Sequence, residues 1–255
     1  MEKLEFAYDE PAAIVRHGSE SYLVVGDLHI GKELKLSAKG IRIYGTTDQM
    51  AERIITLMRR HKANNLILLG DVKDSILRAE SVEARLILNF FKRLAGYNII
   101  LVQGNHDAGL GDYPGLAKVK EFKLGNIGLI HGNSLPSEEM MRSEFIIAGH
   151  DHPAALVGSE GEGRMEKVWV VMQMKYTAAA KLYKNPERKV RLILMPAFND
   201  LISGNDVTRG GRILNPLVRR GLFDFKKAKF YPLGGGGPVR VPKVTPEHGS
   251  RHSHA

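Results

Sequence analysis

Five times in this sequence, a short apolar run leads into a polar cluster that contains glycine. The runs are rich in Val, Ile and Leu and have the length of buried strands. They are Tyr22–Val25, Leu66–Leu69, Ile99–Val102, Ile127–Ile130 and Phe145–Ala148, and they lead into GDLH, GDVKD, GNHD, HGN and GHDH. In open α/β sheets, ligands bind at the carboxyl ends of the strands. The five clusters therefore predict one binding site at one edge of a sheet.

Two amphipathic stretches between these runs predict helices. Thr47–His61 and Glu80–Ala95 both repeat apolar residues at helical spacing, which gives each stretch one apolar face. Two further apolar runs, Val168–Met174 and Val190–Met195, follow later in the chain. Strands that alternate with helices predict an α/β or mixed layered core.

The composition limits the chemistry of the site. The chain has 255 residues, which suits one domain with a short appendage, and it contains no cysteine. Disulfides, thiolate metal sites and cysteine nucleophiles are therefore excluded, and a metal would have to bind through His, Asp, Glu or Asn. The N-terminus lacks the apolar core of a secretory signal, and no apolar run is long enough to span a membrane. We expect a cytoplasmic protein without membrane contact.

The polar clusters contain residue types that bind divalent metal ions. They supply carboxylates, imidazoles and one amide oxygen, from Asp27, His29, Asp71, Asn105, His131, His150 and His152. Gly26 permits the unusual backbone geometry that would turn the first two of these side chains toward one ion. Two ions about 3.5–4 Å apart can clamp the attacking and leaving oxygens of a phosphoryl displacement. The set therefore predicts a two-metal site for the hydrolysis of phosphate esters.

The order of these motifs resembles that of the calcineurin-like metallophosphoesterases. The shared motifs are Asp27-x-His29, Gly70-Asp71, Gly104-Asn105-His106-Asp107, His131-Gly132 and Gly149-His150-x-His152. Together they cover roughly residues 22 to 152. The resemblance implies an α/β fold in which two mixed β-sheets pack as a sandwich flanked by helices.

The resemblance also implies a role for each residue. One metal ion would be held by Asp27, His29 and His152. The other would be held by Asn105, His131 and His150. Asp71 would bridge the two ions. His106 would be the catalytic histidine that contacts the phosphoryl group and the leaving oxygen, and Asp107 would orient it.

The metal itself is less restricted by the sequence. We expect Mn²⁺, and Fe, Ni²⁺ or Zn²⁺ also suit ligands of this kind. At one position the chain departs from the family pattern. Many members carry arginine after GDxxD, whereas Ser75 follows Asp74 here. The departure concerns the residues that support Asp71, not Asp71 itself.

A narrower resemblance points to DNA. The segments DLHIGKELKLSAKGI, GHDHPA and MPAFNDLISGNDV resemble an ICC-like subgroup that includes ligase-associated DNA-damage endonucleases. This resemblance extends to about residue 208 and implies a role in DNA repair by analogy.

Nearly all of the excess positive charge lies near the C-terminus. The formal net charge is +9, and residues 209–243 contain nine Lys or Arg against one acid, Asp224. Aromatic residues lie among them, so cations can follow a phosphate backbone while rings stack on bases. The pattern predicts nucleic acid as the partner. The predicted substrate contacts are Arg219, Arg220, Lys226 and Lys227, together with Lys73 from the second cluster.

We expect three segments along the chain. A catalytic domain would cover 1–208, and a basic extension packed on or near it would cover 209–233. A flexible tail would cover 234–255, because it opens with four glycines and ends in a polar run. In the first segment, Lys32, Lys35 and Lys39 are interpreted as a solvated helical face rather than as phosphate contacts.

Three function hypotheses follow from these observations. The first is a two-metal phosphodiesterase that cleaves DNA or RNA, and the second is a phosphodiesterase or phosphatase that acts on a small nucleotide. The third is a non-catalytic interaction scaffold, against which His106 and the complete ligand set argue. The sequence leaves protein partners and oligomeric state open.

Overall fold

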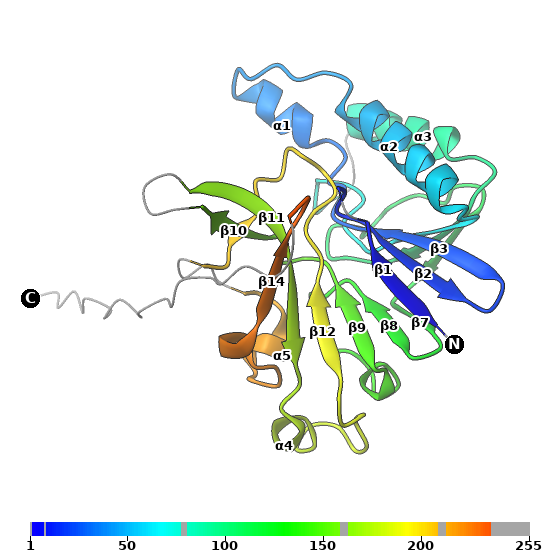
Figure 1. Ribbon diagram of the computed structural model, residues 1–255. Helices are drawn as coiled ribbons and strands as arrows, with labels where there is room; N and C mark the ends of the chain where they lie inside the picture. The colour runs from blue at the N-terminus through cyan, green and yellow to red at the C-terminus, as the bar shows by residue number, and fades with distance from the viewer. Residues whose placement is uncertain (1, 8, 78–80, 159–162, 209–212, 236–255) are drawn as a thin grey trace, which may run out of the picture.

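The computed structural model describes residues 2–7, 9–77, 81–158, 163–208 and 213–235, whose strands form two mixed β-sheets (Figure 1). The first sheet has six strands in the order β1-β2-β3-β4-β5-β6. Their bounds are β1 (Lys3–Phe6), β2 (Ala13–His17), β3 (Glu20–Val25), β4 (Asn65–Leu68), β5 (Asn98–Val102) and β6 (Leu116–Val119). Neighbours from β1 to β3 are antiparallel, and β3 to β6 are parallel.

The second sheet has the order β13-β10-β11-β12-β9-β8-β7, and β14 also pairs with β11. Its strands are β7 (Glu121–Leu124), β8 (Ile127–Ile130), β9 (Phe145–Ala148), β10 (Pro153–Val157), β11 (Arg164–Gln173), β12 (Arg191–Leu194), β13 (Asn205–Asp206) and β14 (Lys229–Pro232). The central strands β8, β9 and β12 are parallel to one another. Both sheets therefore contain a parallel block, which is where the predicted site residues follow the strands.

Helices cover the outer sides of the two sheets. They are α1 (Lys32–Ala38), α2 (Thr46–His61), α3 (Ser81–Arg93), α4 (Tyr176–Ala179) and α5 (Pro216–Arg219), with 3₁₀ turns at Met140–Arg142 and Phe225–Lys227. Figure 1 shows α2 and α3 side by side above the first sheet, and α4 and α5 at the second. In the described ranges, no helix is long and apolar enough to cross a bilayer.

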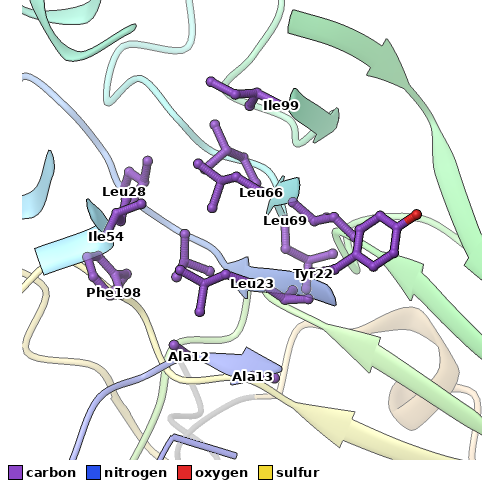
Figure 2. Packing of buried hydrophobic residues seen from close by; sticks show 14 of the residues in the cluster. Ala12, Ala13, Tyr22, Leu23, Leu28, Ile54, Leu66, Leu69, Ile99 and Phe198 are labelled. Carbon is purple, nitrogen blue, oxygen red and sulfur yellow. The ribbon is translucent and has the colours of Figure 1, made fainter. Parts of the chain in front are cut away.

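The larger hydrophobic cluster joins the first sheet to its helices and to the second sheet. Figure 2 shows Leu23 of β3 close to Ile54 of α2 and to Phe198, which follows β12. From the second sheet, Trp169 of β11 is 2% exposed and stacks on Phe6 of β1, with ring centroids 4.3 Å apart. The two sheets therefore share one core.

A second hydrophobic cluster lies on the other face of the second sheet. Successive strand residues point to opposite faces. Trp169 and Ile193 accordingly belong to the shared core, while their neighbours Val170 and Leu192 belong to the second cluster. Leu217 of α5 is fully buried in that second cluster. The middle of the second sheet is thus covered on both faces.

The structure confirms the predicted sandwich of two mixed sheets with flanking helices. Both predicted helices are present as α2 and α3, and the seven predicted strands are β3, β4, β5, β8, β9, β11 and β12. The remaining strands were not predicted from the sequence. Their apolar stretches are short and interrupted by charged, small or proline residues.

Part of the predicted basic extension is built into the second sheet. β14 pairs with β11, and Phe223 and Phe230 are buried in the second cluster. Residues 209–212 and 236–255 lie outside the described residues, so the predicted tail is described only at Gly234 and Gly235. The domain boundary at residue 208 remains a prediction.

Candidate metal centre

Every predicted metal ligand lies just beyond the end of a parallel strand. β3, β4 and β5 of the first sheet lead to Asp27, His29, Asp71 and Asn105, and β8 and β9 of the second sheet lead to His131, His150 and His152. Parallel strands bring their carboxyl ends to the same edge of a sheet. Since the two sheets pack together, both edges contribute to one site.

Among the described residues, three groups of side chains lie close enough to hold a metal ion: two consist only of predicted ligands, and the third is His29, Asp71 and the predicted catalytic His106. Asp27, His29 and His152 form the first group, in which the ligand atoms all lie within 4.8 Å of one another. Oδ1 of Asp27 lies 3.2 Å from Nε2 of His152, and Nε2 of His29 lies 3.3 Å from the same nitrogen. These are the three residues that the resemblance assigns to one ion.

The second group consists of Asp71, His131 and His150, again within 4.8 Å. Nε2 of His131 lies 3.3 Å from Oδ1 of Asp71 and 3.3 Å from Oδ1 of Asn105. The other carboxylate oxygen of Asp71 lies 3.7 Å from Nε2 of His29, in the first group. One oxygen of Asp71 thus faces each group, which suits a bridging ligand.

The ligands are held in backbone conformations that side chains rarely adopt. In the described part of the chain six residues other than glycine have positive φ, and five of them are predicted ligands: Asp27 (56°), His29 (41°), Asp71 (50°), His150 (71°) and His152 (45°). The sixth, Lys62, ends α2 as its C-cap. Strained residues of this kind cost about 1–3 kcal/mol each and gather at functional sites.

At two glycines, metal ligands occupy the space where a side chain would otherwise lie. A Cβ on Gly70 would lie 2.2 Å from Nδ1 of His131, and one on Gly104 would lie 2.3 Å from Oδ1 of Asp71. Both distances are far below van der Waals contact. A side chain at either position would therefore displace a ligand.

The electrostatics of the site favour bound cations. Burial would raise the pKa of Asp71, but the hydrogen bond and charge of His131 hold that pKa well below its usual value. Burial would lower the pKa of His131, yet Asp71 and Asp27 raise it to about 9. Burial lowers the pKa of His150 to about 4, so its ring is neutral and free to coordinate. Buried ionised carboxylates demand positive charge, which a proton on His131 or a metal ion supplies.

A hydrogen bond from behind fixes the orientation of the His131 ring, and a carboxylate lies behind the His29 ring. Nδ1 of His131 donates to the carbonyl of Leu69 at 2.9 Å, because a carbonyl can only accept, and this leaves Nε2 for a metal ion. Nδ1 of His29 lies 3.4 Å from Oδ1 of Asp74. Such outer partners set the ring orientation and raise the basicity of metal-binding histidines. The donor set and its orientation fit divalent ions.

His106 reaches the centre from the loop after β5. Its Nδ1 donates to the carbonyl of Asp74 at 2.8 Å, and its backbone N–H donates to Oδ1 of Asp71 at 2.9 Å. Nε2 lies 3.9 Å from Oδ2 of Asp71, and the side chain is 19% exposed. The ring therefore presents Nε2 to the open side of the site.

The resemblance assigns the orientation of His106 to Asp107, but the contacts place this task on the Asp74 carbonyl. The Asp107 carboxylate instead accepts hydrogen bonds from the backbone N–H groups of Asp71, Val72 and Gly104, at 2.8–2.9 Å. Asp107 thus ties the loop after β4 to the loop after β5. It acts on the site through the backbone of Asp71.

Lys73 is buried rather than open to substrate. Its Nζ donates to the carbonyls of Leu77 at 2.6 Å, Ile76 at 3.3 Å and Ser75. A substrate contact by Lys73 remains a prediction without support from these contacts. Its ammonium braces the loop after Asp74.

The Ser75 position, where the family often has arginine, is supported in a different way. Oε1 of Glu83 accepts the backbone N–H groups of Asp74 at 3.0 Å and Ser75 at 2.9 Å, and the Ser75 hydroxyl donates to Oε2. The loop that carries Asp74 is therefore supported by Glu83 of α3, although the chain lacks the family arginine.

Five of the seven predicted metal ligands line a cavity of about 790 Å³, namely His29, Asp71, Asn105, His150 and His152. Lys32 and Lys35 of α1 line it, although the sequence interpretation made them a solvated face, and Lys39 does not. The apolar residues Leu201 and Leu214 also belong to its lining. None of the predicted contacts Arg219, Arg220, Lys226 and Lys227 lines this cavity, and all four are exposed.

Besides Glu83, the sequence interpretation missed another buried residue that supports the site. Asn199, fully buried, donates from Nδ2 to the carbonyl of Leu28 at 2.7 Å. This bond holds the loop between the ligands Asp27 and His29. The only sign in the sequence was the resemblance of the segment MPAFNDLISGNDV, which contains it.

A family model for calcineurin-like phosphoesterases matches residues 21–224. The match spans most of the chain and includes every predicted metal ligand. The chain belongs to this family. Calcineurin-like phosphoesterases typically bind a dinuclear metal centre, so this protein is a metal-dependent hydrolase of phosphate esters whose two candidate groups correspond to such a centre.

A solved structure shares this fold. The crystal structure of Pseudomonas putida nuclease MPE is 21% identical, with a TM-score of 0.55 over 93% of this chain and 100% of that chain. A conserved uncharacterized protein from Streptococcus pneumoniae, a predicted phosphoesterase, is 15% identical, with a TM-score of 0.29 over 69% of this chain and 71% of that chain. This second likeness is too low to carry an argument. No curated protein matches the chain.

The geometry indicates separate roles in hydrolysis for bound metal ions and for His106. Bound metal ions would supply positive charge to the phosphoryl group and to the attacking and leaving oxygens. The two groups of ligands around Asp71 would hold them. Because the Asp74 carbonyl holds Nδ1 of His106, that ring would act on substrate through Nε2, from which it would donate a proton to the leaving oxygen.

Replacement of Asp71 by asparagine should empty the centre. Asp71→Asn removes a negative charge shared by both groups, so metal affinity should fall by more than the roughly 10–100-fold typical of losing an outer partner. Metal content measured by mass spectrometry and turnover of bis-p-nitrophenyl phosphate should fall together. Asp112→Asn, at a side chain 99% exposed, is the matched control. Two bound metals with ordinary turnover in Asp71→Asn would refute the bridging role.

His106→Ala should leave the metals in place. The catalytic rate should fall by about 10²–10⁴-fold, the range for a lost general acid–base group. A diester with a poor leaving group should suffer more than a p-nitrophenyl ester, since p-nitrophenolate needs little protonation. Parallel metal analysis checks the assignment, because loss of metal would make His106 a ligand.

Proposed function

We propose that this protein is a nuclease that hydrolyses phosphodiester bonds in DNA or RNA with two divalent metal ions, preferentially Mn²⁺. The metal preference rests on a donor set of imidazole, carboxylate and amide oxygen without thiolate. The ICC-like resemblance, which includes ligase-associated endonucleases, extends the proposal to a role in DNA repair.

The cavity above the metal ligands carries the substrate proposal. It is open, and Lys32 and Lys35 line it beside the ligand groups. Nζ of Lys35 lies 2.6 Å from Oδ2 of Asp74, and Nζ of Lys32 lies 4.0 Å from Oδ1. Lys32 is therefore the less engaged of the two and has a charge available for a phosphate next to the scissile one.

The rest of the lining suits the non-phosphate part of a nucleotide. Leu201, Ile202 and Leu214 add apolar surface, and Leu214 is 43% exposed. Apolar side chains can pack against sugars and bases. The fold shared with Pseudomonas putida nuclease MPE, over nearly the whole chain, also supports the proposal.

The predicted contacts at Arg219, Arg220, Lys226 and Lys227 remain part of the proposal. They are exposed and lie outside the cavity lining. They would therefore meet a polynucleotide away from the scissile bond. A small nucleotide bound in the cavity has no need of them.

A substrate panel tests the proposed function. With Mn²⁺, single-stranded DNA, duplex DNA, RNA and cyclic nucleotides are compared by kcat/KM. We expect at least one polynucleotide to be hydrolysed more efficiently than any cyclic nucleotide. Hydrolysis of cyclic nucleotides alone would replace the nuclease proposal by the small-nucleotide alternative, and no hydrolysis of any diester would favour a scaffold.

Lys32→Ala should raise KM for the polynucleotide substrate roughly 10-fold, the loss expected for one charge-assisted contact. The value of kcat and the metal content should change little, because Lys32 is not a ligand. Lys39→Ala, an exposed lysine at the C-terminal end of the same helix, is the matched control. Equal KM values for the two variants would remove Lys32 from the substrate site.

A further inference from the structure

One end of the second sheet is not covered by the first sheet. On the side of β11 and β12 that faces the shared core, Trp169 and Ile193 are buried. Alternate residues of a strand share a face. Gln173 of β11 and Arg191 of β12, paired neighbours on this same side, are exposed and half-buried respectively. The sheet therefore continues past the edge of its partner.

Two adjoining hollows lie at this uncovered end, with volumes of about 360 and 500 Å³, and both include Gln173, Met174 and Arg191. Six cationic side chains line them: Lys175, Arg188, Lys189, Arg191, Lys227 and Lys229. Glu144 and Asp224 are the acids in this lining, so the cations exceed the acids by four. We call this surface the basic end.

Much of this charge is available to a ligand. Arg191 pairs with Glu144, and its guanidinium lies 4.0 Å from the centre of the Phe145 ring. Nζ of Lys227 lies 4.0 Å from Oδ2 of Asp224. Both acids therefore already have cationic partners. In the described part of the chain, no ion pair engages the three exposed lysines Lys175, Lys189 and Lys229.

The basic end also offers aromatic surface. Tyr231 of β14 is half-buried in the larger hollow, next to Lys229 and Lys227. Arg188 lies over the ring of Tyr176, with its guanidinium carbon 4.8 Å from the ring centre. Cations that follow a backbone, interleaved with rings on which bases stack, are the pattern of single-strand binding surfaces.

We propose that the basic end is a binding site for single-stranded nucleic acid, separate from the catalytic cavity. This inference rests on the proposed function and adds a second contact to it. Phosphates would meet Lys175, Lys189 and Lys229, and a base would stack on Tyr231. An acidic polypeptide would match the charge but not use the ring.

The site is distinct from the metal centre because the two lie at opposite ends of the same strands. β9 begins with Phe145 at the basic end and leads to His150 at the metal centre. Its four residues are separated by three steps of about 3.3 Å, so the strand spans roughly 10 Å from its first to its last Cα. A polynucleotide can touch both places, whereas a mononucleotide in the cavity leaves the basic end empty.

Binding without turnover tests the proposal. Fluorescence anisotropy of a labelled oligodeoxythymidine phosphorothioate of about 20 nucleotides, whose linkages resist hydrolysis, is measured with the Mn²⁺-loaded protein at three salt concentrations. Lys175→Ala, Lys189→Ala and Lys229→Ala are combined in one variant. Three lost phosphate contacts should reduce the log–log salt slope by about 2, since each contributes about 0.7 on a single strand. At low salt the affinity should fall roughly 10-fold or more.

A charge-matched variant is the control. Arg59→Ala, Lys92→Ala and Lys120→Ala together remove three exposed cations, which lie in α2, in α3 and between β6 and β7. The control should bind nearly as the unaltered protein does, and both variants should turn over bis-p-nitrophenyl phosphate normally. Equal losses in the two variants would overturn the inference, because the attraction would then be a general effect of net charge. Binding of polyglutamate as tight as that of the oligonucleotide would overturn it in favour of an acidic protein partner.

The outcomes separate this inference from the proposed function. If polynucleotides are cleaved but the two variants bind alike, the inference that the basic end binds nucleic acid is wrong and the nuclease proposal stands. If the oligonucleotide binds through the basic end but only small nucleotides are hydrolysed, the nuclease proposal is wrong and the binding site stands.

Discussion

The metal centre depends on one buried carboxylate, that of Asp107, which belongs to neither group of metal ligands. Asp107 accepts three backbone hydrogen bonds and so joins the loops that follow two adjacent strands of the first sheet. Burial raises its pKa, and the N–H groups of Gly104 and Val72 partly offset that effect. Each buried N–H left without an acceptor costs about 1–3 kcal/mol. Without Asp107, the backbone N–H of Asp71 would lose its hydrogen-bond acceptor. The Asp71 carboxylate would then no longer be held between the two groups of ligands.

The part of the structure that was predictable from the sequence is the part that is local. Each ligand stands within a few residues of a strand of Val, Ile and Leu, so an apolar run and the cluster after it are visible together. Because neighbouring parallel strands run in the same direction, their carboxyl ends and the clusters that follow them lie at one edge of the sheet. The edge strands escaped prediction because their stability comes from a neighbour and not from their own apolar residues. β14, for example, contains Lys229 and Pro232 and becomes a strand by pairing with β11.

Contacts between distant segments escaped prediction for a related reason. The solvated face expected for Lys32 and Lys35 is part of the cavity because α1 packs beside Asp74, 39 residues beyond Lys35. Asn199 supports a loop that lies 171 residues earlier. In each case the sequence indicates the chemistry of the residue, but it does not show which distant group the residue contacts.

Because the metal ligands come from both sheets, metal binding would affect the stability of the folded protein. Each candidate group draws residues from both sheets: His152 joins Asp27 and His29, while Asp71 joins His131 and His150. A bound ion therefore fastens one sheet to the other at an edge where buried carboxylates and strained backbone would otherwise work against closure. Ligands that bind only the folded state stabilise it in proportion to the logarithm of their free concentration. The stability of this fold would thereby depend on the metal supply of its surroundings, so scarcity would lower the stability of the protein as well as its activity.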